Sequence, residues 1–239
     1  MVLLCLKTGC IVSEFQSYCL PIEQPRLSPF CTQLTGITQS MVEQGVPLKT
    51  CLMLFKQWLE KVCRQFKIIL NGVNLTEEVE GDLKNATCCT WSDWDLGVCL
   101  ENECNRKQLK KPEYFNNWID IRAVYRNFYN RKPQGLNGAL REVGLHFQGR
   151  EHSGIEDARN TAKLIWKMVE GGCKLDVKES TRDERKASVE AGSLKSENYF
   201  KEYISERSEK STPSRSKWRN YRTGPHVIPS GIKIGPPPN

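Results

Sequence analysis

Residues 47–66 carry the longest regular pattern in the chain and limit its fold most strongly. Behind Pro47, apolar side chains recur at helical spacing from Leu48 through Phe55 to Phe66. Charged residues, among them Lys56, occupy the opposite face. This periodicity predicts an amphipathic helix that begins after Pro47 and buries one face against another layer of structure.

Shorter elements surround this helix. Residues 2–6 and 11–19 predict a hairpin around a Thr8-Gly9 turn, and the polar stretch 71–87 predicts a loop. Further strands are expected at 67–70, at 88–91, near Ile119 and at 173–177. Further helices are expected at 39–44, 138–144 and 155–169. Another helix is expected to begin at residue 96, and one more to end near residue 128. Strands that alternate with helices favour an α/β domain of about 175 residues.

Composition changes after residue 177. Residues 178–239 are rich in Ser, Lys, Arg and Glu and poor in aliphatic side chains. We therefore expect one domain over 1–177 and a disordered basic tail over 178–239 that acts as a tether or a nonspecific contact for polyanions.

Charge and cysteine content narrow the class of protein. The net charge of +7 favours a polyanionic partner such as nucleic acid. The eleven cysteines form no C-x-x-C pair, which favours free, buried or half-buried thiols in a reducing compartment. No run of eighteen apolar residues occurs, so we expect an intracellular protein, in the cytoplasm, the nucleus or both, with no membrane span.

The stretch GREHSGIEDARNTAKL places a histidine just before a helix and an aspartate inside its first turn. His152 can fold back toward Asp157, so that both side chains face one cavity. An imidazole can accept a proton from water at neutral pH, and a carboxylate can hold Mg²⁺ or Mn²⁺. Together they suggest metal-assisted hydrolysis. Alternatively, Asp157 only opposes the helix dipole and His152 is a loop residue bonded to backbone.

Two more stretches carry candidate site residues. In WSDWDLGVCL, Asp93 and Asp95 follow a predicted strand, where α/β sheets place their sites, although either could be a helix cap. Further along, a basic and aromatic stretch offers phosphate contacts, or else a solvated face over core aromatics. Its candidate nucleic-acid contacts are Arg106, Lys107, Lys110 and Lys111.

These stretches resemble one family. TWSDWDLG, NWIDIRAVYRNFY and GLNGALREVGLHFQGREHSGIEDARNTAKLIWKM, in this order, are similar to the DEDDh 3′–5′ exonucleases, on the Eri-type exoribonuclease branch. The resemblance covers residues 2–177. It implies a ribonuclease-H-like mixed sheet flanked by helices, in which four carboxylates and a histidine surround two Mg²⁺ (or Mn²⁺) ions.

By the resemblance, Asp95 and Asp157 match two of the metal ligands, and His152 matches the general base that activates the attacking water. The substrate implied is the single-stranded 3′ end of RNA. The sequence does not identify a protein partner.

One family motif has no counterpart here. The first motif is an Asp-x-Glu on a central opening strand, whereas the first acidic residue of this chain is Glu14. We therefore expect an N-terminally truncated member without that strand and with impaired activity. A catalytically inactive RNA-binding remnant is the main alternative, and a DNA-preferring 3′–5′ exonuclease is a weaker one.

Overall fold

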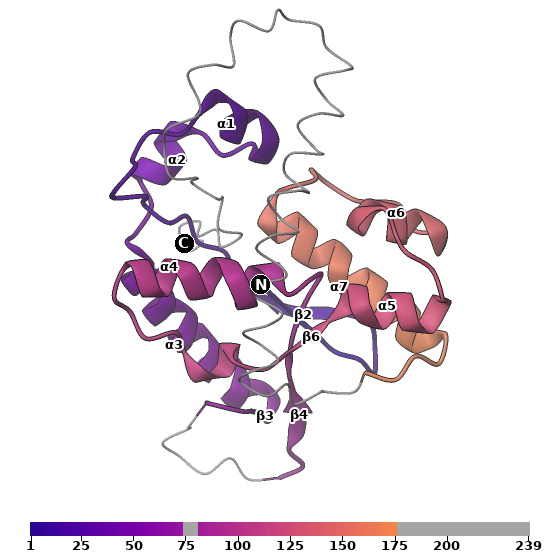
Figure 1. Cartoon of the computed structure of the whole chain (residues 1–239). Helices are drawn as coiled ribbons and strands as arrows, with labels where there is room; N and C mark the ends of the chain where they lie inside the picture. Colours follow the sequence, from indigo (N-terminus) through magenta and orange to yellow (C-terminus); the bar gives the residue numbers. More distant parts are fainter. Residues whose placement is uncertain (74–80, 176–239) are drawn as a thin grey trace, which may run out of the picture.

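The computed structural model describes residues 1–73 and 81–175 (Figure 1). The predicted tail over 178–239 lies outside the described residues, as do the last two residues of the strand expected at 173–177. The strands are β1 (Val2–Leu4), β2 (Ile11–Glu14), β3 (Ile68–Leu70), β4 (Lys84–Ala86), β5 (Cys88–Thr90) and β6 (Trp118–Asp120).

Helices make up most of the remaining regular structure. The α-helices are α1 (Pro29–Thr35), α2 (Gln39–Glu43), α3 (Leu48–Phe66), α4 (Leu100–Arg106), α5 (Ile121–Tyr129), α6 (Gly135–Glu142) and α7 (Gly154–Glu170). A π-helix, η1 (Trp94–Cys99), leads directly into α4, and a 3₁₀ turn, η2 (Glu113–Phe115), precedes β6.

The strands form three pairs within the described residues. β1 and β2 are antiparallel, whereas β3–β4 and β5–β6 are parallel. Parallel and antiparallel pairs together with flanking helices confirm the predicted mixed α/β class, with the sheet divided into two-stranded pieces.

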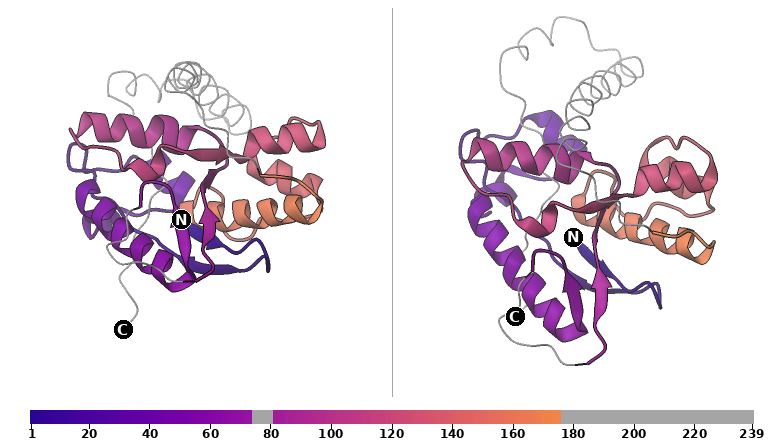
Figure 2. Two further views of the ribbon diagram at one scale, coloured as in Figure 1. Left: turned by 90° about the horizontal axis from the view of Figure 1, so that it is seen from below. Right: turned by 60° about the horizontal axis from the view of Figure 1, so that its bottom comes forward.

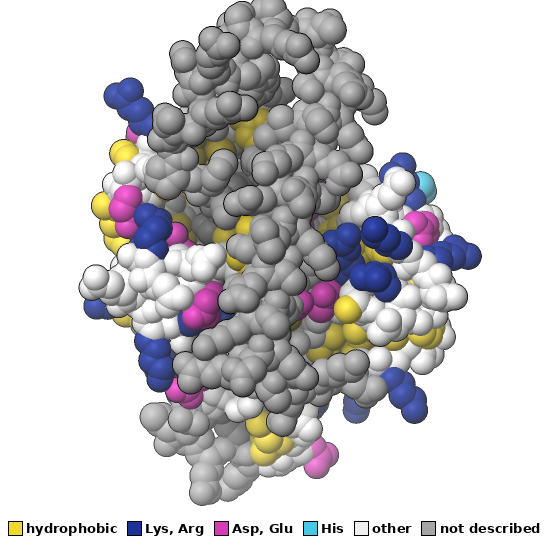
Figure 3. Space-filling model, viewed as in Figure 1, with side chains coloured by type: hydrophobic (Ala, Val, Ile, Leu, Met, Phe, Trp, Pro, Cys, Tyr) yellow, Lys and Arg dark blue, Asp and Glu magenta, His cyan; other side chains and the backbone are white. Residues whose placement is uncertain are grey.

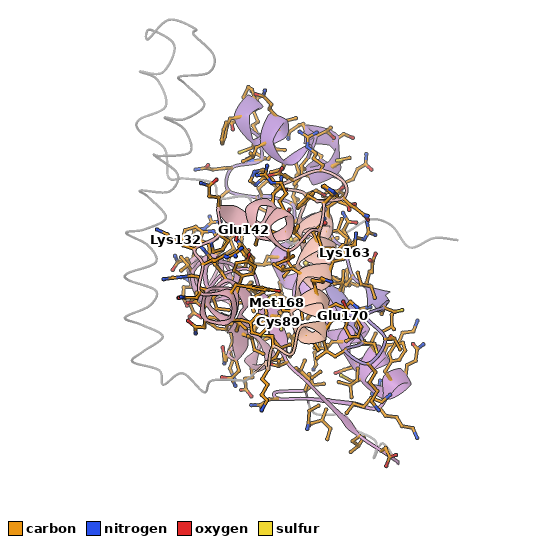
Figure 4. All side chains as sticks on the ribbon, turned by 90° about the vertical axis from the view of Figure 1, so that its right-hand side faces the viewer. Cys89, Lys132, Glu142, Lys163, Met168 and Glu170 are labelled. Carbon is orange, nitrogen blue, oxygen red and sulfur yellow. The ribbon has the colours of Figure 1, made fainter. Side chains whose placement is uncertain are left out.

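Two apolar clusters lie on opposite sides of the strands. The α3 cluster is built around Phe55 and Leu59, and the α7 cluster around Leu164 and Met168. Both views in Figure 2 show α3 and α7 on opposite sides of the strands. In Figure 4, Cys89 of β5 lies beside Met168, with which it shares the α7 cluster.

Neighbouring strand residues alternate between these clusters. Leu3 and Cys88 pack in the α3 cluster, whereas Leu4 and Cys89 pack in the α7 cluster. This follows from the two-residue period of a β-strand, which sends successive side chains to opposite faces. Both faces of β1 and β5 are therefore apolar.

Polar contacts hold the β1–β2 hairpin between the two long helices. On one side, Trp58 Nε1 of α3 donates to Ser13 Oγ at 3.0 Å. On the other, Arg159 of α7 donates to both carboxylate oxygens of Glu14, at 2.8 and 2.5 Å. The Arg159 guanidinium lowers the pKa of Glu14, as expected for a charge-assisted pair.

The helices expected from periodicity are present, but four short segments differ from prediction. The strand expected at 11–19 ends at Glu14. α1 was not predicted, although Ser28 caps it by accepting from Cys31 N and Pro29 begins it. β4 occupies part of the stretch 71–87 that was predicted to be a loop. Its residues are mostly polar, and they form a strand because they pair with β3. Residues 173–175 form no strand.

The expectation of free thiols is confirmed for all eleven cysteines, which lie within the described residues. Ten are buried or half-buried, whereas Cys10 in the hairpin loop is exposed. None of the helices over 1–73 and 81–175 combines the length and apolar character needed to cross a bilayer.

The hairpin turn at Gly9 offers a test of this packing. Gly9 has a φ of 70°, and a Cβ there would lie 2.5 Å from the Trp166 indole of α7. We expect Gly9→Ala to lower the free energy of unfolding by about 2–5 kcal/mol, from left-handed strain plus overpacking. Denaturant unfolding would measure the loss.

Gly144→Ala is the matched control, because Gly144 has a φ of 80° and a methyl group added to it would meet no neighbour within 4 Å. It should lose only the strain, about 1–2 kcal/mol. Equal losses in the two variants would show that Trp166 does not pack tightly on the hairpin.

Candidate active site

A cavity of about 1450 Å³ lies between the strands and the two long helices. Three residues singled out in the sequence line it, namely Asp95, His152 and Asp157. They come from two regions of the chain, the segment after β5 and the start of α7. The fold thus brings all three to one recess.

Asp95 projects from the π-helix η1. The Leu100 N–H bonds to the Asp95 carbonyl, an i→i+5 contact that widens this turn. The side chain is exposed toward the cavity. Because surrounding protein displaces bulk water there, burial raises the Asp95 pKa to about 6. A cation in the cavity would therefore stabilise the ionised carboxylate.

Asp93 lies at the same strand end but has a different role. Its Oδ1 accepts from Trp118 Nε1 of β6 at 2.9 Å, and its side chain makes no cap hydrogen bond to η1. Asp93 therefore ties the start of η1 to β6, and Asp95 is the carboxylate of this pair that lines the cavity.

Asp157 and His152 are joined directly. Asp157 is the fourth residue of α7, and its Oδ1 accepts the backbone N–H of His152 at 3.2 Å. The Asp157 N–H in turn donates to the Ser153 carbonyl at 2.8 Å. These contacts fold the loop back over the helix start, as the sequence suggested, and fix the His152 backbone relative to the carboxylate.

His152 also holds an unusual backbone conformation. Its φ of 63° lies in the left-handed region. This conformation costs a non-glycine residue about 1–3 kcal/mol and is concentrated at functional sites. The residue is exposed and lines both the large cavity and a neighbouring groove of about 530 Å³. His152 therefore stands where the two recesses meet.

The neighbouring groove contains residues that the sequence did not single out. It runs between α1, α6 and the loop before α7, and it is lined among others by Gln33, Asn137, Arg141 and His146. Arg150 closes one side by donating to the Gln33 carbonyl. Figure 3 shows Lys and Arg side chains gathered over α5 and α6. No local pattern marks these residues, because residues of α1 and α6 line one groove only in the folded chain.

The four predicted nucleic-acid contacts lie elsewhere, in and after α4. Arg106 and Lys107 pair with Glu23 and Glu103, and Lys110 pairs with Glu113. Lys111 is nearly buried, donates to the Leu96 carbonyl at 2.7 Å and lies over the Trp118 ring. These pairings occupy the side chains in intramolecular contacts, and their role in nucleic-acid binding stays a prediction.

Carboxylate oxygens suit a hard divalent cation. Mg²⁺ is commonly held by one or two carboxylates together with water and substrate phosphate, and Asp95 and Asp157 place two carboxylates of this ligand type along one cavity. Among residues 1–73 and 81–175, no group of three or more His, Cys, Asp or Glu side chains gathers at metal-binding distances. The two-ion arrangement implied by the resemblance needs oxygen ligands beyond this pair.

Comparisons of the sequence with known proteins match this chain to exonucleases. A family model described as exonuclease matches residues 4–165. ERI1 exoribonuclease 2 of Homo sapiens is 55% identical over 179 residues, which are 75% of this chain and 26% of that protein. The 3′-5′ exonuclease Snipper of Drosophila melanogaster is 48% identical over 171 residues, 72% of this chain and 59% of that protein. The chain spans less than two thirds of either relative.

Solved structures agree with the sequence relatives. The nuclease domain of 3′hExo, a DEDDh family member bound to rAMP, matches with a TM-score of 0.65 at 30% identity. That match covers 75% of this chain and 83% of the other. A 3′-exonuclease that recognises the 3′ end of histone mRNA stem-loop matches with a TM-score of 0.61 at 31% identity, over 77% and 75% of the two chains.

The raised pKa of Asp95 predicts a pH-dependent stability change. Between its unfolded value near 3.8 and about 6, the folded state binds a proton more tightly than the unfolded state, so stability falls as pH rises through this window. We expect Asp95→Asn to raise the melting temperature at pH 7.5 in EDTA and to leave it nearly unchanged below pH 4.

Asp93→Asn is the comparison variant, since it removes a charge two residues away and keeps an oxygen for Trp118. Thermal unfolding of both variants across pH 3.5–8 would measure the effect. A loss of stability in Asp95→Asn at neutral pH would show that its ionised carboxylate is stabilised by the fold.

Proposed function

Because the chain belongs to the exonuclease family, on the branch of the ERI1 exoribonucleases, we propose that it hydrolyses the 3′-terminal phosphodiesters of RNA with the help of a divalent metal ion. This membership confirms the resemblance read from its sequence. The observation that carries the proposal is the meeting of Asp95, His152 and Asp157 at one cavity. By the resemblance read from the sequence, each of them matches a residue of a family motif.

In this proposal Asp95 and Asp157 hold the metal, preferably Mg²⁺ or Mn²⁺, by their carboxylate oxygens. The bound ion would supply positive charge against the scissile phosphate. Asp95 favours a cation because its ionised form is costly in the cavity without one. Asp157 already accepts the His152 N–H, so its carboxylate orientation is set before substrate binds.

His152 acts as the general base. A neutral imidazole can remove a proton from the attacking water, which contributes about 10²–10⁴ to the rate of such reactions. The Asp157 contact to its backbone and the left-handed φ restrict where the ring can stand. Its place between the large cavity and the groove would let it meet a phosphodiester that enters from the groove side.

The groove beside His152 supplies the approach for RNA. Arg141 is exposed along it, and Arg126 of α5 and Arg131, which follows α5, are exposed as well. Cationic side chains near a reacting phosphodiester attract the nucleic-acid backbone without reading its sequence. RNA is the favoured substrate because both structural neighbours described above have RNA components in their complexes, and DNA is the weaker alternative.

The proposed activity should produce a ladder of RNA products that are shortened from the 3′ end only when a divalent metal ion is present. We expect 5′-labelled single-stranded RNA to shorten stepwise with Mg²⁺ or Mn²⁺ and to stay intact in EDTA. His152→Ala should reduce the single-turnover rate about 10²–10⁴-fold, because it removes the general base. A matched DNA oligonucleotide tests the substrate preference.

His146→Ala serves as the comparison, because His146 lines only the groove and should change RNA affinity more than the rate at saturation. Salt-sensitive RNA binding without metal-dependent shortening, in folded protein, would instead indicate an RNA-binding module without catalysis. Faster shortening of DNA than of RNA would indicate a DNA-preferring exonuclease.

The position of the groove predicts which cationic side chains bind the RNA phosphates. Arg141→Gln should weaken RNA binding and lower the slope of log affinity against log salt by about 0.7, the value of one single-strand phosphate contact. Arg106→Gln is matched in chemistry, but its guanidinium is already paired with Glu103 and Glu23. Filter binding at several salt concentrations measures both slopes. A larger slope change in Arg106→Gln would place the RNA along α4.

A further inference from the structure

We propose that Asn160, in the middle of α7, is a positioning residue for His152, because its side-chain amide holds the loop 145–152 against the helix. The inference rests on the proposed function, in which His152 is the general base. Asn160 lines neither the large cavity nor the groove. It can therefore affect the reaction only through the residues that it holds.

Asn160 is a buried polar side chain whose hydrogen-bonding groups are paired. Its exposed fraction is 0%. Its Oδ1 accepts the Gln148 N–H at 2.9 Å, and its Nδ2 donates to the carbonyls of Gln148 and Glu156, each at 2.8 Å. A side-chain amide has two donor hydrogens and one acceptor oxygen. Both kinds of group are therefore used, and two of the three bonds go to a single loop residue.

These two bonds hold the backbone of Gln148 and not its side chain. In an antiparallel β-pair, a residue exchanges its N–H and its C=O with the backbone of one neighbour. Gln148 belongs to no strand, and its own side chain is exposed. The Asn160 amide thus takes the place of a strand neighbour at residue 148.

The loop depends on such outside contacts because its backbone is irregular. Residues 145–148 belong to no helix or strand. Gly144, Gly149 and His152 have positive φ values of 80°, 86° and 63°. A non-glycine residue stays in that conformation only where the surrounding structure imposes it. The path of the chain into His152 is therefore set by the groups that bind the loop.

Asn160 is the buried member of the set of loop contacts. Other contacts involve exposed loop residues, namely those of the Gln148 side chain with Lys163, Arg150 with the Gln33 carbonyl, Glu151 with Asn137 and His152 with Asp157. At an exposed residue water can replace a lost hydrogen bond, whereas a buried group that loses its partner bears the full cost of desolvation. The bonds of Asn160 are thus the ones that water replaces least well.

Asn160 and Asp157 attach the loop to the same face of α7. Residues three apart are neighbours on a helix surface. Asp157 holds the His152 N–H, and Asn160 holds Gln148, four residues earlier. Two attachments to one helix fix the direction of the segment as well as its distance.

The two attachments differ in how they respond to a metal ion. In the proposed function the Asp157 carboxylate also binds the ion, so the same group serves two partners. The Asn160 amide is neutral and does not titrate. Its hold on the loop is therefore the same with or without the ion and over the whole pH range of the reaction.

Substitutions at Asn160 test the proposal on the full chain. Asn160→Ala removes all three bonds. Asn160→Asp keeps the shape and the acceptor for the Gln148 N–H, but it directs a carboxylate oxygen at two carbonyls. Because a catalytic group misplaced by about 1 Å can cost about 10²-fold in rate, both variants should lower the single-turnover rate on 5′-labelled RNA at saturation about 30-fold or more. RNA affinity measured in EDTA should change less than about threefold, since a positioning residue acts on the rate.

Hydrogen exchange reads the loop without RNA or metal. In EDTA, Asn160→Ala should speed exchange of the Gln148 amide about tenfold or more, because that N–H loses its acceptor. Circular dichroism establishes that the variants are folded, and Asn160→Asp carries the rate measurement if Asn160→Ala does not fold.

Two control variants separate positioning from general stability. Met168→Ala empties a fully buried position of α7 beside Cys89 (Figure 4), so it should lower the melting temperature without changing the rate at saturation or the exchange of residue 148. Gln148→Ala removes the side-chain contact to Lys163 but keeps both backbone bonds to Asn160, so it should react as the parent does.

Rates like that of the parent in the Asn160 variants would overturn the proposal. An equal loss in Met168→Ala would overturn it too, because the effect would then be one of stability. Weaker RNA binding with an unchanged rate at saturation would assign Asn160 to affinity instead. If the parent itself shortens no RNA, the proposed function fails, and the exchange measurement decides the inference alone. Unchanged exchange at Gln148 in Asn160→Ala would then contradict it, and faster exchange confined to residues 145–152 would support it.

Discussion

The placement of the strands between two apolar clusters is the constraint on which the rest of the structure depends. Each strand has to present apolar side chains to α3 on one face and to α7 on the other, as Leu3 and Leu4 do in succession. Asp95 follows the end of β5, and Asp157 opens α7. Both carboxylates therefore owe their positions to the same packing, although neither belongs to a cluster.

Features set by neighbouring residues could be predicted from the sequence. The long helix α3 follows from the spacing of Leu48, Phe55 and Phe66, and α7 from a similar pattern after His152. β4 could not be predicted, since its polar residues form a strand only by pairing with β3. α1 carries a local signal in Ser28 and Pro29, but its seven residues are too few for a period to show.

The candidate site, too, has one part that could be predicted from neighbouring residues and one part that could not. His152, Asp157 and Asp95 stand at a helix start and a strand end, positions that a sequence marks by itself. The groove has no such local mark, because Gln33 of α1 and Asn137 of α6 line one recess only in the folded chain. The basic stretch that contains Arg106 and Lys107 is the opposite case, because its sequence suggested a site whose cations the fold pairs internally. Its cations are conspicuous in the sequence, but the carboxylate of Glu23, distant along the chain, lies against Arg106 and Lys107.

The π-helix after β5 has a consequence for how this site tolerates change in chain length. Because η1 closes by an i→i+5 bond from Leu100 to Asp95, it holds one residue more than a regular turn before α4 begins. Loss of one residue there would let an ordinary α-helix form, with better hydrogen bonding. It would also turn Asp95 by about 100° relative to the buried face of α4, where Leu100 and Cys104 pack. The number of residues in this single turn thus sets the direction of the Asp95 carboxylate, and a turn one residue shorter would form a more regular helix but point this carboxylate elsewhere.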